Sequence, residues 1–217
     1  MSIELYVFPP SPRAFKVMAI ANHLGIETKI RPLDLVKGEQ KTYEYAALNP
    51  NMRMPTMKDG DYVLWESCAI EQYLADKKPD SGLFPKDQRA RLDVTRWQFW
   101  ETAHWDPACA VFLYENLIKP VILKIGDPDA AALAKGTENF ERAAKVLDAQ
   151  LKGKKFISGG TVTIADFGIA APLNYAEAGR LPVGPYREIN RWYATMRALP
   201  AWQKTLTQCQ LPAAAAA

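Results

Sequence analysis

Short apolar runs, separated by turn residues and one helical repeat, fill the first third of the chain. Residues 3–8 are apolar and rich in β-forming side chains, and Pro9 follows them, which predicts a buried strand. From Pro12 apolar residues recur at the spacing of one helix face, and Gly25 marks the end of that helix. A second strand is expected at about 28–35.

A hairpin and a helix complete this pattern. Asp59-Gly60 lies between two β-prone runs, at 56–58 and 62–65, and this dipeptide is typical of a tight β-hairpin. A helical repeat follows at about 67–77. The order strand, helix, strand, hairpin, helix predicts a layered α/β domain with helices covering one sheet.

The remaining chain has the pattern of an all-helical domain. Proline, glycine and polar residues mark 79–87 as a linker, so we expect domains at 1–78 and 88–217. A long helix, with a kink, is expected from 88 to 119, ending before Pro120. Asp127-Pro128 has the pattern of an N-cap followed by the first helical residue. Further helices are expected at 163–178, 185–198 and 201–207, and the terminal PAAAAA is expected to fray.

Charge and cysteine content narrow the class of protein. The 27 basic and 24 acidic side chains leave a net charge of +3, too small and too mixed for nucleic-acid binding. Three scattered cysteines, Cys68, Cys109 and Cys209, favour reduced thiols over a disulfide framework and show no metal-binding spacing. The sequence shows neither a secretory signal nor a membrane-spanning run. We therefore expect a cytoplasmic protein without a metal.

Met54-Pro55 is the first candidate for binding chemistry. A proline just before a hairpin strand is a candidate for a cis peptide bond, a geometry usually kept in tight turns. The cis form would leave the backbone N–H and C=O of Met54 free to pair with an extended peptide. An ordinary trans proline at the start of a strand is the alternative.

Glu66 and Ser67 stand at the start of the helix that follows the hairpin. A helix N-terminus attracts a carboxylate, a serine hydroxyl adds a donor, and Glu66 can pair with an ammonium group. Together they suit the α-amino-acid end of a ligand. The alternative is a plain helix cap, because serine and acidic residues favour the first turn of helices.

The stretch LNPNMRMPTMKDGDYVLWESCAIEQYLADK resembles the glutathione site of cytosolic glutathione transferases, of the serine-type phi-like and theta-like kind. The family pattern appears in order as Asn49-Pro50, Met54-Pro55, Glu66–Ile70 and Tyr73-Leu74. The resemblance implies a thioredoxin-like first domain, a helical second domain, glutathione as co-substrate and a homodimer. It also implies a cis bond before Pro55.

The resemblance assigns residues to the parts of glutathione. Met54 pairs through its backbone with the cysteinyl part, and Glu66 and Ser67 hold the γ-glutamyl end. Gln40 and Lys41 fall where phi-like members contact the glycine carboxylate. Arg53 replaces an amide that contacts glutathione in those members, and its guanidinium can pair with a carboxylate.

Ser11 matches the catalytic serine of phi-like members by its place between the first strand and helix. A hydroxyl there would stabilise the glutathione thiolate, which is the attacking form. The alternative is an N-cap, because Ser11-Pro12 also fits the start of a helix. Tyr6 is the rival donor, but the alignment offsets it by one strand position, which points it to the opposite face. No cysteine lies in 9–15 to act as a protein nucleophile.

The second substrate is expected to be a hydrophobic electrophilic small molecule. By resemblance, its pocket is lined by Pro10 and Phe15 from the first domain and by Trp105, Ala108 and Phe112 from the long helix. Trp105 belongs to an aromatic cluster with Trp97, Phe99 and Trp100, for which a helix-core role is the alternative, and that role is expected for Trp97 and Trp100. His104 is expected to be structural.

The sequence therefore predicts a glutathione S-transferase, with glutathione-dependent peroxide reduction or dehalogenation, or a non-catalytic stress protein, as alternatives. Thr163 and Asp166 form a capping-box pattern that supports folding of the helical domain. Asn51 stands where phi-like members have the phenylalanine that locks the two subunits together.

Overall fold

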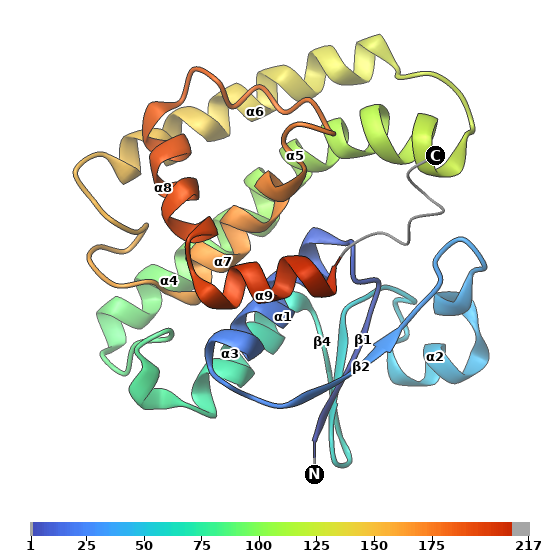
Figure 1. The fold of residues 1–217 in the computed structure, drawn as a ribbon, viewed down its shortest axis with the longest axis vertical. Helices are drawn as coiled ribbons and strands as arrows, with labels where there is room; N and C mark the ends of the chain where they lie inside the picture. Colours follow the sequence, from blue (N-terminus) through green and yellow to red (C-terminus); the bar gives the residue numbers. More distant parts are fainter. Residues whose placement is uncertain (1, 210–217) are drawn as a thin grey trace. The chain divides into compact units, whose positions relative to one another are not determined.

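The computed structural model describes residues 2–209, which form two compact units. The first unit contains residues 2–84 and 199–209, and the second contains 85–198. Figure 1 shows a sheet with its helices in the first unit and helices alone in the second. The expected terminal segment PAAAAA lies outside the described residues.

A four-stranded sheet forms the centre of the first unit. Its strands are β1 (Ile3–Val7), β2 (Thr28–Pro32), β3 (Thr56–Asp59) and β4 (Tyr62–Trp65), in the order β2-β1-β3-β4. β2 runs parallel to β1, whereas β3 is antiparallel to both β1 and β4. Gly60 adopts a φ of 65° between β3 and β4, which glycine tolerates readily, so the predicted hairpin is confirmed.

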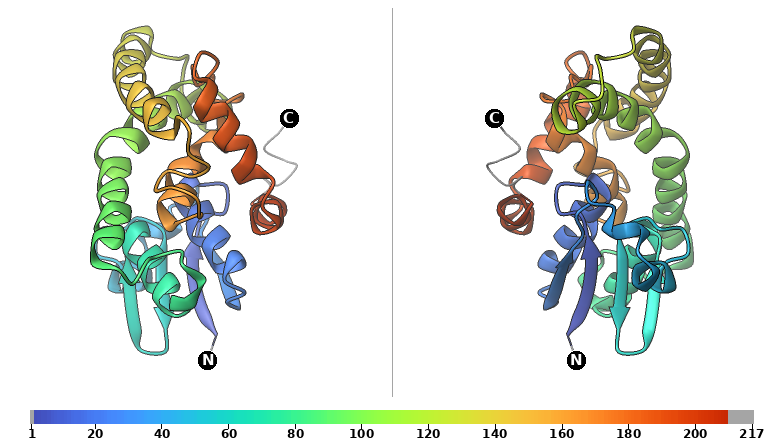
Figure 2. Two further views of the ribbon diagram at one scale, coloured as in Figure 1. Left: turned by 90° about the vertical axis from the view of Figure 1, so that its left-hand side faces the viewer. Right: turned by 90° about the vertical axis from the view of Figure 1, so that its right-hand side faces the viewer.

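Helices cover both faces of this sheet. They are α1 (Pro12–His23), α2 (Tyr43–Leu48), α3 (Ser67–Asp76) and α9 (Pro200–Gln208), with short 3-10 turns η1 (Glu39–Lys41) and η2 (Pro79–Ser81). α1 packs against both α3 and α9, and α2 lies on the other side of the sheet (Figure 2). α1 buries every residue from Ala14 to Ala21, because the sheet, α3 and α9 surround it.

The expected division of the chain differs from the structure at α9. The Phe15 and Trp202 rings lie 4.6 Å apart between centroids, and Asn22 Nδ2 donates to Thr205 Oγ1 at 2.8 Å. These contacts hold α9 in the first unit, although the sequence pattern assigned it to the helical domain. The first unit also continues to Phe84, inside the expected linker, and Leu83 and Phe84 are both buried.

The second unit is built from helices alone. They are α4 (Gln88–Trp100), α5 (Asp106–Leu113), α6 (Ala130–Leu151), α7 (Ile164–Ala170) and α8 (Arg187–Arg197), with π-helical segments η3 (Glu101–Trp105) and η4 (Tyr114–Leu123) and a 3-10 segment η5 (Ala171–Tyr175). The path from α4 to η4 is helical throughout. α6 crosses α5 closely at Gly136, where a Cβ would lie 2.8 Å from Val111 Cγ1.

Two expected helix limits in this unit are wrong. The long helix does not end before Pro120, because the π-helical geometry of η4 accommodates the proline and continues to Leu123. α6 is capped by Asp129, not Asp127, because the Asp129 carboxylate accepts from the amides of Ala131 and Ala132 at 2.8 and 3.1 Å. The expected helix at 163–178 is divided into α7 and η5.

Asp166 on α7 organises the core of the second unit. Its Oδ2 accepts from the backbone N–H and the hydroxyl of Thr163, both at 2.9 Å, so the predicted reach-back of the capping box is confirmed. Its Oδ1 accepts from the amide of Ile157 and from Trp192 Nε1, both at 2.9 Å. All seven residues of α7 are buried. The Asp166 carboxylate thus links the loop at Ile157, the start of α7 at Thr163 and α8 at Trp192.

Candidate functional site

The predicted glutathione-binding residues of the first unit come together at one edge of the sheet. Tyr6 on β1 is paired with Thr56 on β3, and Thr56 is paired with Trp65 on β4. The chain therefore leaves β1, enters β3 and leaves β4 at the same edge, with about 4.8 Å between neighbouring strands. Ser11 follows the end of β1, Met54-Pro55 immediately precedes the start of β3, and Glu66-Ser67 immediately follows the end of β4, so all three segments lie at this edge.

Ser11 occupies the N-cap position of α1 but holds it through its backbone. Its N–H donates to Phe8 O at 2.8 Å, and its carbonyl accepts from Phe15 N at 2.8 Å. Within the described residues its hydroxyl makes no capping hydrogen bond. The side chain is 8% exposed. The hydroxyl is therefore not used as a helix cap, and the backbone fixes the place from which it can donate.

Tyr6, the rival donor, is held within the sheet. Its hydroxyl donates to Glu4 Oε2 at 3.1 Å, and Glu4 also accepts from Arg31 Nη2 at 2.6 Å. Burial, followed by the hydrogen bond to Glu4, raises the pKa of the Tyr6 phenol above its ordinary value. Val7, the next residue, is fully buried on the other face. The Tyr6 hydroxyl is thus engaged in a hydrogen bond within the sheet, whereas the Ser11 hydroxyl makes no capping hydrogen bond in the described residues.

The peptide bond between Met54 and Pro55 is cis, so the geometry implied by the family resemblance is confirmed. The loop before it is held by a buried side chain, because Asn49 Nδ2 donates to Arg53 O at 2.8 Å and to Thr56 Oγ1 at 3.0 Å. Tyr45 adds a hydrogen bond from its hydroxyl to Arg53 O at 2.6 Å. The backbone of Met54 is therefore fixed between two anchored neighbours.

Sequence reasoning did not single out the anchors Tyr45 and Thr56. Tyr45 is 4% exposed and Thr56 is fully buried, and their hydroxyl oxygens lie 2.8 Å apart. The available signal was Thr56, a polar residue at the start of a strand. Nothing in the sequence indicated that it pairs with Tyr45, which lies 11 residues earlier.

Glu66 adopts an unusual backbone conformation at the start of α3. Its φ is 71° and its ψ is 116°, in the region that glycine favours and that other residues seldom occupy. Its side chain is exposed, and no side chain in the described part of the chain caps α3. Strained residues of this kind occur preferentially where they position a ligand. The plain-cap alternative for this pair therefore does not describe the structure.

Ser67 is the first residue of α3 and is 7% exposed. Its position places a hydroxyl beside the free backbone N–H groups of the first helical turn. These groups and the helix dipole together favour a bound carboxylate. Exposed Glu66 and nearly buried Ser67 thus offer an acceptor for an ammonium group and donors for a carboxylate.

Gln40, Lys41 and Arg53 lie in two segments next to the same edge. Gln40 and Lys41 belong to η1, which follows β2, the strand that pairs with β1. Gln40 Oε1 is buried and has no hydrogen-bond partner in the structure of residues 2–209. The side chains of Lys41 and Arg53 are exposed. The set provides two exposed cations and one amide whose oxygen has no partner in the described residues.

The residues expected to contact the electrophile are mostly buried inside their own units. Phe15 is fully buried against Trp202 of α9. Trp105 is also fully buried, and its indole donates to Ile169 O at 2.8 Å. Ala108 and Phe112 are 2% and 5% exposed. These four residues serve as core in this structure, because tight packing uses the apolar surface that a ligand would need.

Pro10 differs from that group because it is half-buried and adjoins Ser11. An apolar ring at this place presents surface beside the hydroxyl. It is the one member of the expected electrophile set that combines exposure with closeness in sequence to Ser11.

A buried lysine that the sequence reasoning missed lies under α3. Lys16 is 1% exposed, and its Nζ lies 3.3 Å from Cys68 Sγ and 3.7 Å from Glu71 Oε2. The sequence feature that could have indicated this buried lysine is its position in the middle of the apolar run of α1.

The other two thiols, Cys109 and Cys209, are buried. Burial raises the pKa of Cys109 well above its ordinary value and that of Cys209 to about 12. Both residues are free cysteines.

Residues 2–209 contain no group of three or more side chains suited to holding a metal ion. They also contain no helix with the length and apolarity needed to cross a membrane.

Comparison with known proteins identifies the family. A model of the glutathione S-transferase N-terminal domain matches residues 1–76, and a model of the C-terminal domain matches residues 104–200. Glutathione S-transferase 3 of Zea mays is 33% identical over 217 residues, which is 97% of this chain and 96% of that one. The chain belongs to the glutathione S-transferase family.

Solved structures of the glutathione S-transferase family share the fold. The apo form of glutathione S-transferase III matches with a TM-score of 0.86 and 32% identity, over 98% of this chain and 99% of that chain. A family member from Pseudomonas fluorescens, solved with two glutathione molecules bound, matches with a TM-score of 0.83 and 26% identity, over 94% and 92% of the chains. The predicted fold class, a thioredoxin-like domain plus a helical domain, is confirmed.

Proposed function

We propose that this glutathione transferase uses the hydroxyl of Ser11 to stabilise the thiolate of glutathione, which then attacks a hydrophobic electrophile. The observation that carries the proposal is the meeting of Ser11, the backbone of Met54 and the Glu66-Ser67 pair at one sheet edge. Family membership supplies glutathione as the co-substrate and transfer as the reaction.

The tripeptide has complementary groups along this edge. Its γ-glutamyl ammonium pairs with Glu66, and its γ-glutamyl carboxylate accepts from Ser67 and the first turn of α3. Its cysteinyl backbone pairs with the N–H and C=O of Met54, as an added strand would. Its glycine carboxylate pairs with the cations of Lys41 and Arg53 and accepts from the side-chain N–H of Gln40. The anchored loop from Asn49 to Thr56 supports this pairing by fixing Met54 before the ligand arrives.

Ser11 is placed for the thiol itself. A cysteine thiol has an ordinary pKa of about 8.5, and lowering it by one unit needs about 1.4 kcal/mol of preference for the thiolate. A hydroxyl hydrogen bond to a charged sulfur, together with the N-terminus of α1, is of the size needed for one or two units. The protein contributes no covalent nucleophile, so its work is to ionise the sulfur and hold it in place.

The electrophile binds next to the sulfur. Pro10 supports this assignment with half-exposed apolar surface beside Ser11. The thiolate sulfur forms the new carbon–sulfur bond, and the displaced group leaves with its electron pair.

The experiment compares the native protein with Ser11→Ala and with Ser81→Ala, an exposed serine of the segment after α3, as the matched control. Glutathione is titrated by calorimetry, and the ultraviolet absorbance of the bound thiolate is followed across pH. Ser11→Ala should retain glutathione and raise the pKa of the bound thiol towards about 8.5. An unchanged thiol titration in Ser11→Ala would overturn the role of Ser11.

The same titration separates the alternatives. Lack of glutathione binding at millimolar concentration would overturn the transferase function altogether. Binding without conjugation of any aryl halide or conjugated carbonyl, but with turnover of an organic peroxide, would instead favour the peroxidase reaction.

We also propose that the protein acts as a cytoplasmic homodimer. Large apolar side chains are exposed on β4, at Tyr62 (48%) and Trp65 (38%), and on α4, at Leu92 (59%) and Phe99 (71%). Asn51 Nδ2 donates to Asn49 Oδ1 at 3.2 Å, so this side chain is bonded within its own loop. The interface that we propose therefore does not use the contact made by the phenylalanine that phi-like members have at this position. Size-exclusion chromatography with light scattering should give a mass twice the chain mass of 24.3 kDa. A monomer mass at micromolar concentration would contradict the dimer.

A further inference from the structure

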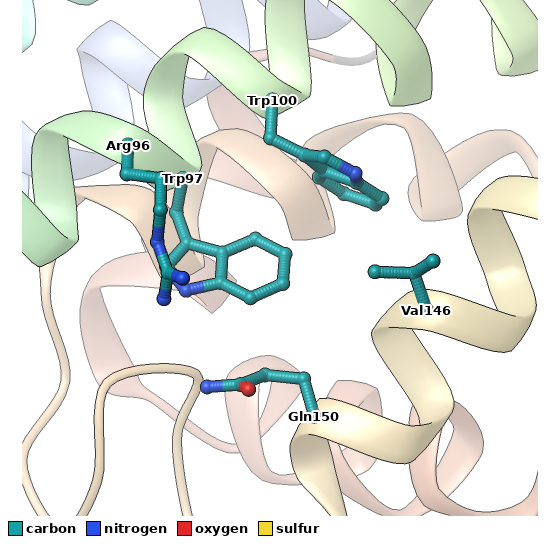
Figure 3. A pocket seen from close by; sticks show the side chains of 5 residues that line it. All are labelled: Arg96, Trp97, Trp100, Val146 and Gln150. Atoms are coloured by element: carbon teal, nitrogen blue, oxygen red, sulfur yellow. The ribbon is translucent and has the colours of Figure 1, made fainter.

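A thiol, an amine and a carboxylate lie together between two helices of the first unit. Lys16 Nζ on α1 donates to Cys68 Sγ on α3 at 3.3 Å, and it lies 3.7 Å from Glu71 Oε2. The second unit has a hollow between α4 and α6 whose lining contains neither a thiol nor an amine (Figure 3): Arg96, Trp97, Trp100, Val146 and Gln150. Lys16 and Cys68 are thus two nucleophiles in direct contact that the conjugation reaction does not use.

The amine of Lys16 is held beside the thiol. Lys16 is 1% exposed, and every residue of α1 from Ala14 to Ala21 is buried. Glu71 is fully buried as well, so its carboxylate compensates the lysine charge in place of water. A lysine at the surface samples many rotamers, whereas this one is enclosed, so its Nζ remains within reach of Cys68 Sγ.

Cys68 is the most accessible of the three thiols. It is half-buried, whereas Cys109 is fully buried and Cys209 is 6% exposed. It is also the second residue of α3, so the free N–H groups of the first turn and the Lys16 cation both favour its thiolate form. The thiolate is the form that hydroperoxides oxidise to a sulfenic acid.

We propose that oxidation by a hydroperoxide joins Cys68 Sγ to Lys16 Nζ through a direct sulfur–nitrogen bond, which cross-links α1 to α3. A sulfenic acid condenses with a nearby backbone nitrogen to give a sulfenamide. Here an amine, which is a stronger nucleophile than a backbone amide, lies 3.3 Å from the sulfur. A hydroperoxide is small enough to reach a half-buried thiol, so the partner and the access that the reaction needs are both present.

The atoms and electrons balance in two steps. The Cys68 thiolate attacks the near oxygen of the hydroperoxide, the oxygen–oxygen bond breaks, and the leaving oxygen takes a proton from the Lys16 ammonium to form an alcohol or water. The sulfur has then lost two electrons to the peroxide, and Lys16 is left as a neutral amine. Its lone pair attacks the sulfur of the sulfenic acid, and the displaced hydroxide takes a proton from the nitrogen and leaves as water.

Glutathione reverses this bond. Its thiolate attacks the Cys68 sulfur, and the nitrogen leaves with the electron pair, takes a proton and becomes the Lys16 amine again. A second glutathione thiolate then attacks the glutathione sulfur of the mixed disulfide, which releases the Cys68 thiolate and glutathione disulfide. The cross-link therefore forms when hydroperoxide is plentiful and glutathione is scarce.

The cross-link affects the glutathione site through residues next to it in the chain. Cys68 follows Ser67 directly, and Ser11 stands at the start of the helix that carries Lys16. A covalent sulfur–nitrogen bond is shorter than the 3.3 Å contact, so its formation draws the first turn of α3 toward α1. This consequence rests on the proposed role of Ser67, and it predicts that the cross-linked protein binds glutathione about tenfold more weakly.

Peptide mapping tests the bond itself. The full-length protein, freed of glutathione, is treated with hydrogen peroxide, digested without reductant and analysed by mass spectrometry. We expect a peptide pair joined through Lys16 and Cys68, with the mass of the two peptides less two hydrogen atoms. Excess glutathione added before digestion should return both peptides to their native masses. Calorimetric titration of the cross-linked and the restored protein measures the change in glutathione affinity.

Matched variants identify the two partners. In Lys16→Met the sulfenic acid of Cys68 has no lysine amine to react with, so it should accumulate and be trapped by dimedone, which should label the native protein far less. Lys78→Met, at an exposed position after α3, is the control and should cross-link as the native protein does. Because Lys16→Met removes the cation that compensates buried Glu71, the double variant with Glu71→Gln provides the same test if the single variant does not fold.

Two results would overturn the proposal. One is the absence of a joined peptide pair after peroxide treatment, whether Cys68 stays reduced or stops at a sulfur oxyacid. The other is a joined pair that carries an added oxygen, which would mean that nitrogen and sulfur are not bonded directly. A cross-link that leaves glutathione affinity unchanged would refute its effect on the site. A reduced protein that binds no glutathione would refute the proposed function, and the peptide map would still decide the cross-link.

Discussion

The side-chain amide of Asn49 donates to the hydroxyl of Thr56 at 3.0 Å, across the loop that contains the Met54–Pro55 peptide bond. The same amide donates to the carbonyl of Arg53 at 2.8 Å, and Asn49 is 3% exposed. One buried side chain thus holds both ends of the segment that presents the Met54 backbone.

Asn49→Ala should weaken glutathione binding and lower stability together. The free energy of unfolding should fall by about 1–3 kcal/mol, because buried partners lose their hydrogen bonds. The dissociation constant for glutathione should rise about tenfold as Met54 loses its fixed position. Urea denaturation and calorimetric titration measure the two effects. Asn139→Ala, at a half-buried position of α6 whose side chain accepts from Arg142, should change neither, and equal behaviour of the two variants would refute the anchoring role.

Glu66 should show opposite effects on stability and on binding. Glu66→Gly should raise the free energy of unfolding by up to about 1 kcal/mol, because glycine adopts a φ of 71° without strain. It should also weaken glutathione binding, because the carboxylate is lost. Glu66→Gln keeps the strained backbone and should weaken binding without the gain in stability. A loss of stability in Glu66→Gly, seen by thermal denaturation, would show that this backbone is not strained.

Asp59 should make part of the stability dependent on acid. The hydrogen bond from Lys77, at 2.6 Å, and that from Tyr73, at 2.8 Å, hold the pKa of Asp59 below its ordinary value in the folded protein. A depressed pKa means that the contribution is complete above the unfolded value of about 3.9 and is lost as the pH falls through the folded value.

Asp59→Asn tests this sign. The difference in unfolding free energy between native protein and variant should be constant from neutral pH to about pH 5 and should shrink below about pH 4. Asp61→Asn, at an exposed position of the same hairpin, is the control and should show no such trend. A difference that grows on acidification would contradict the assignment.

Asp166→Ala should destabilise the helical unit strongly. Its removal leaves the buried amides of Ile157 and Thr163 and the indole of Trp192 without their acceptor, and each such loss costs about 1–3 kcal/mol. We expect a loss of at least about 3 kcal/mol by denaturant unfolding. Asp87→Ala removes an exposed N-cap bond to Ala90 and should cost only about 1 kcal/mol. Comparable losses in the two variants would show that the Asp166 network is not cooperative.

Local signals predicted the first unit well. The strands, the Asp59-Gly60 hairpin and the start of α3 depend on residues close together in sequence, and the structure confirms them. The family motif carried the cis bond before Pro55, which pattern alone did not favour. The positive φ of Glu66 could not be predicted, because only the surrounding fold imposes it.

Contacts between residues far apart in the sequence could not be predicted from the pattern of hydrophobic and polar positions. The sequence suited Trp105 to a ligand pocket or to a helix core and assigned Phe15 to the pocket, whereas in the structure Trp105 donates to Ile169 O and Phe15 packs against Trp202, both partners far along the chain. Asp129 was passed over as the cap because the pattern favours proline at the first helical position. The helical path through Pro120 depends on a π-helical geometry with no sequence signature.

The return of α9 to α1 has a consequence for biosynthesis. Trp202, which completes the packing around Phe15, is synthesised only after the whole of residues 85–198. The first unit cannot close its core until then, although most of it is synthesised first. Residues 85–198 are complete earlier, so the later-made unit can fold while the earlier-made one waits, the reverse of the usual order of vectorial folding.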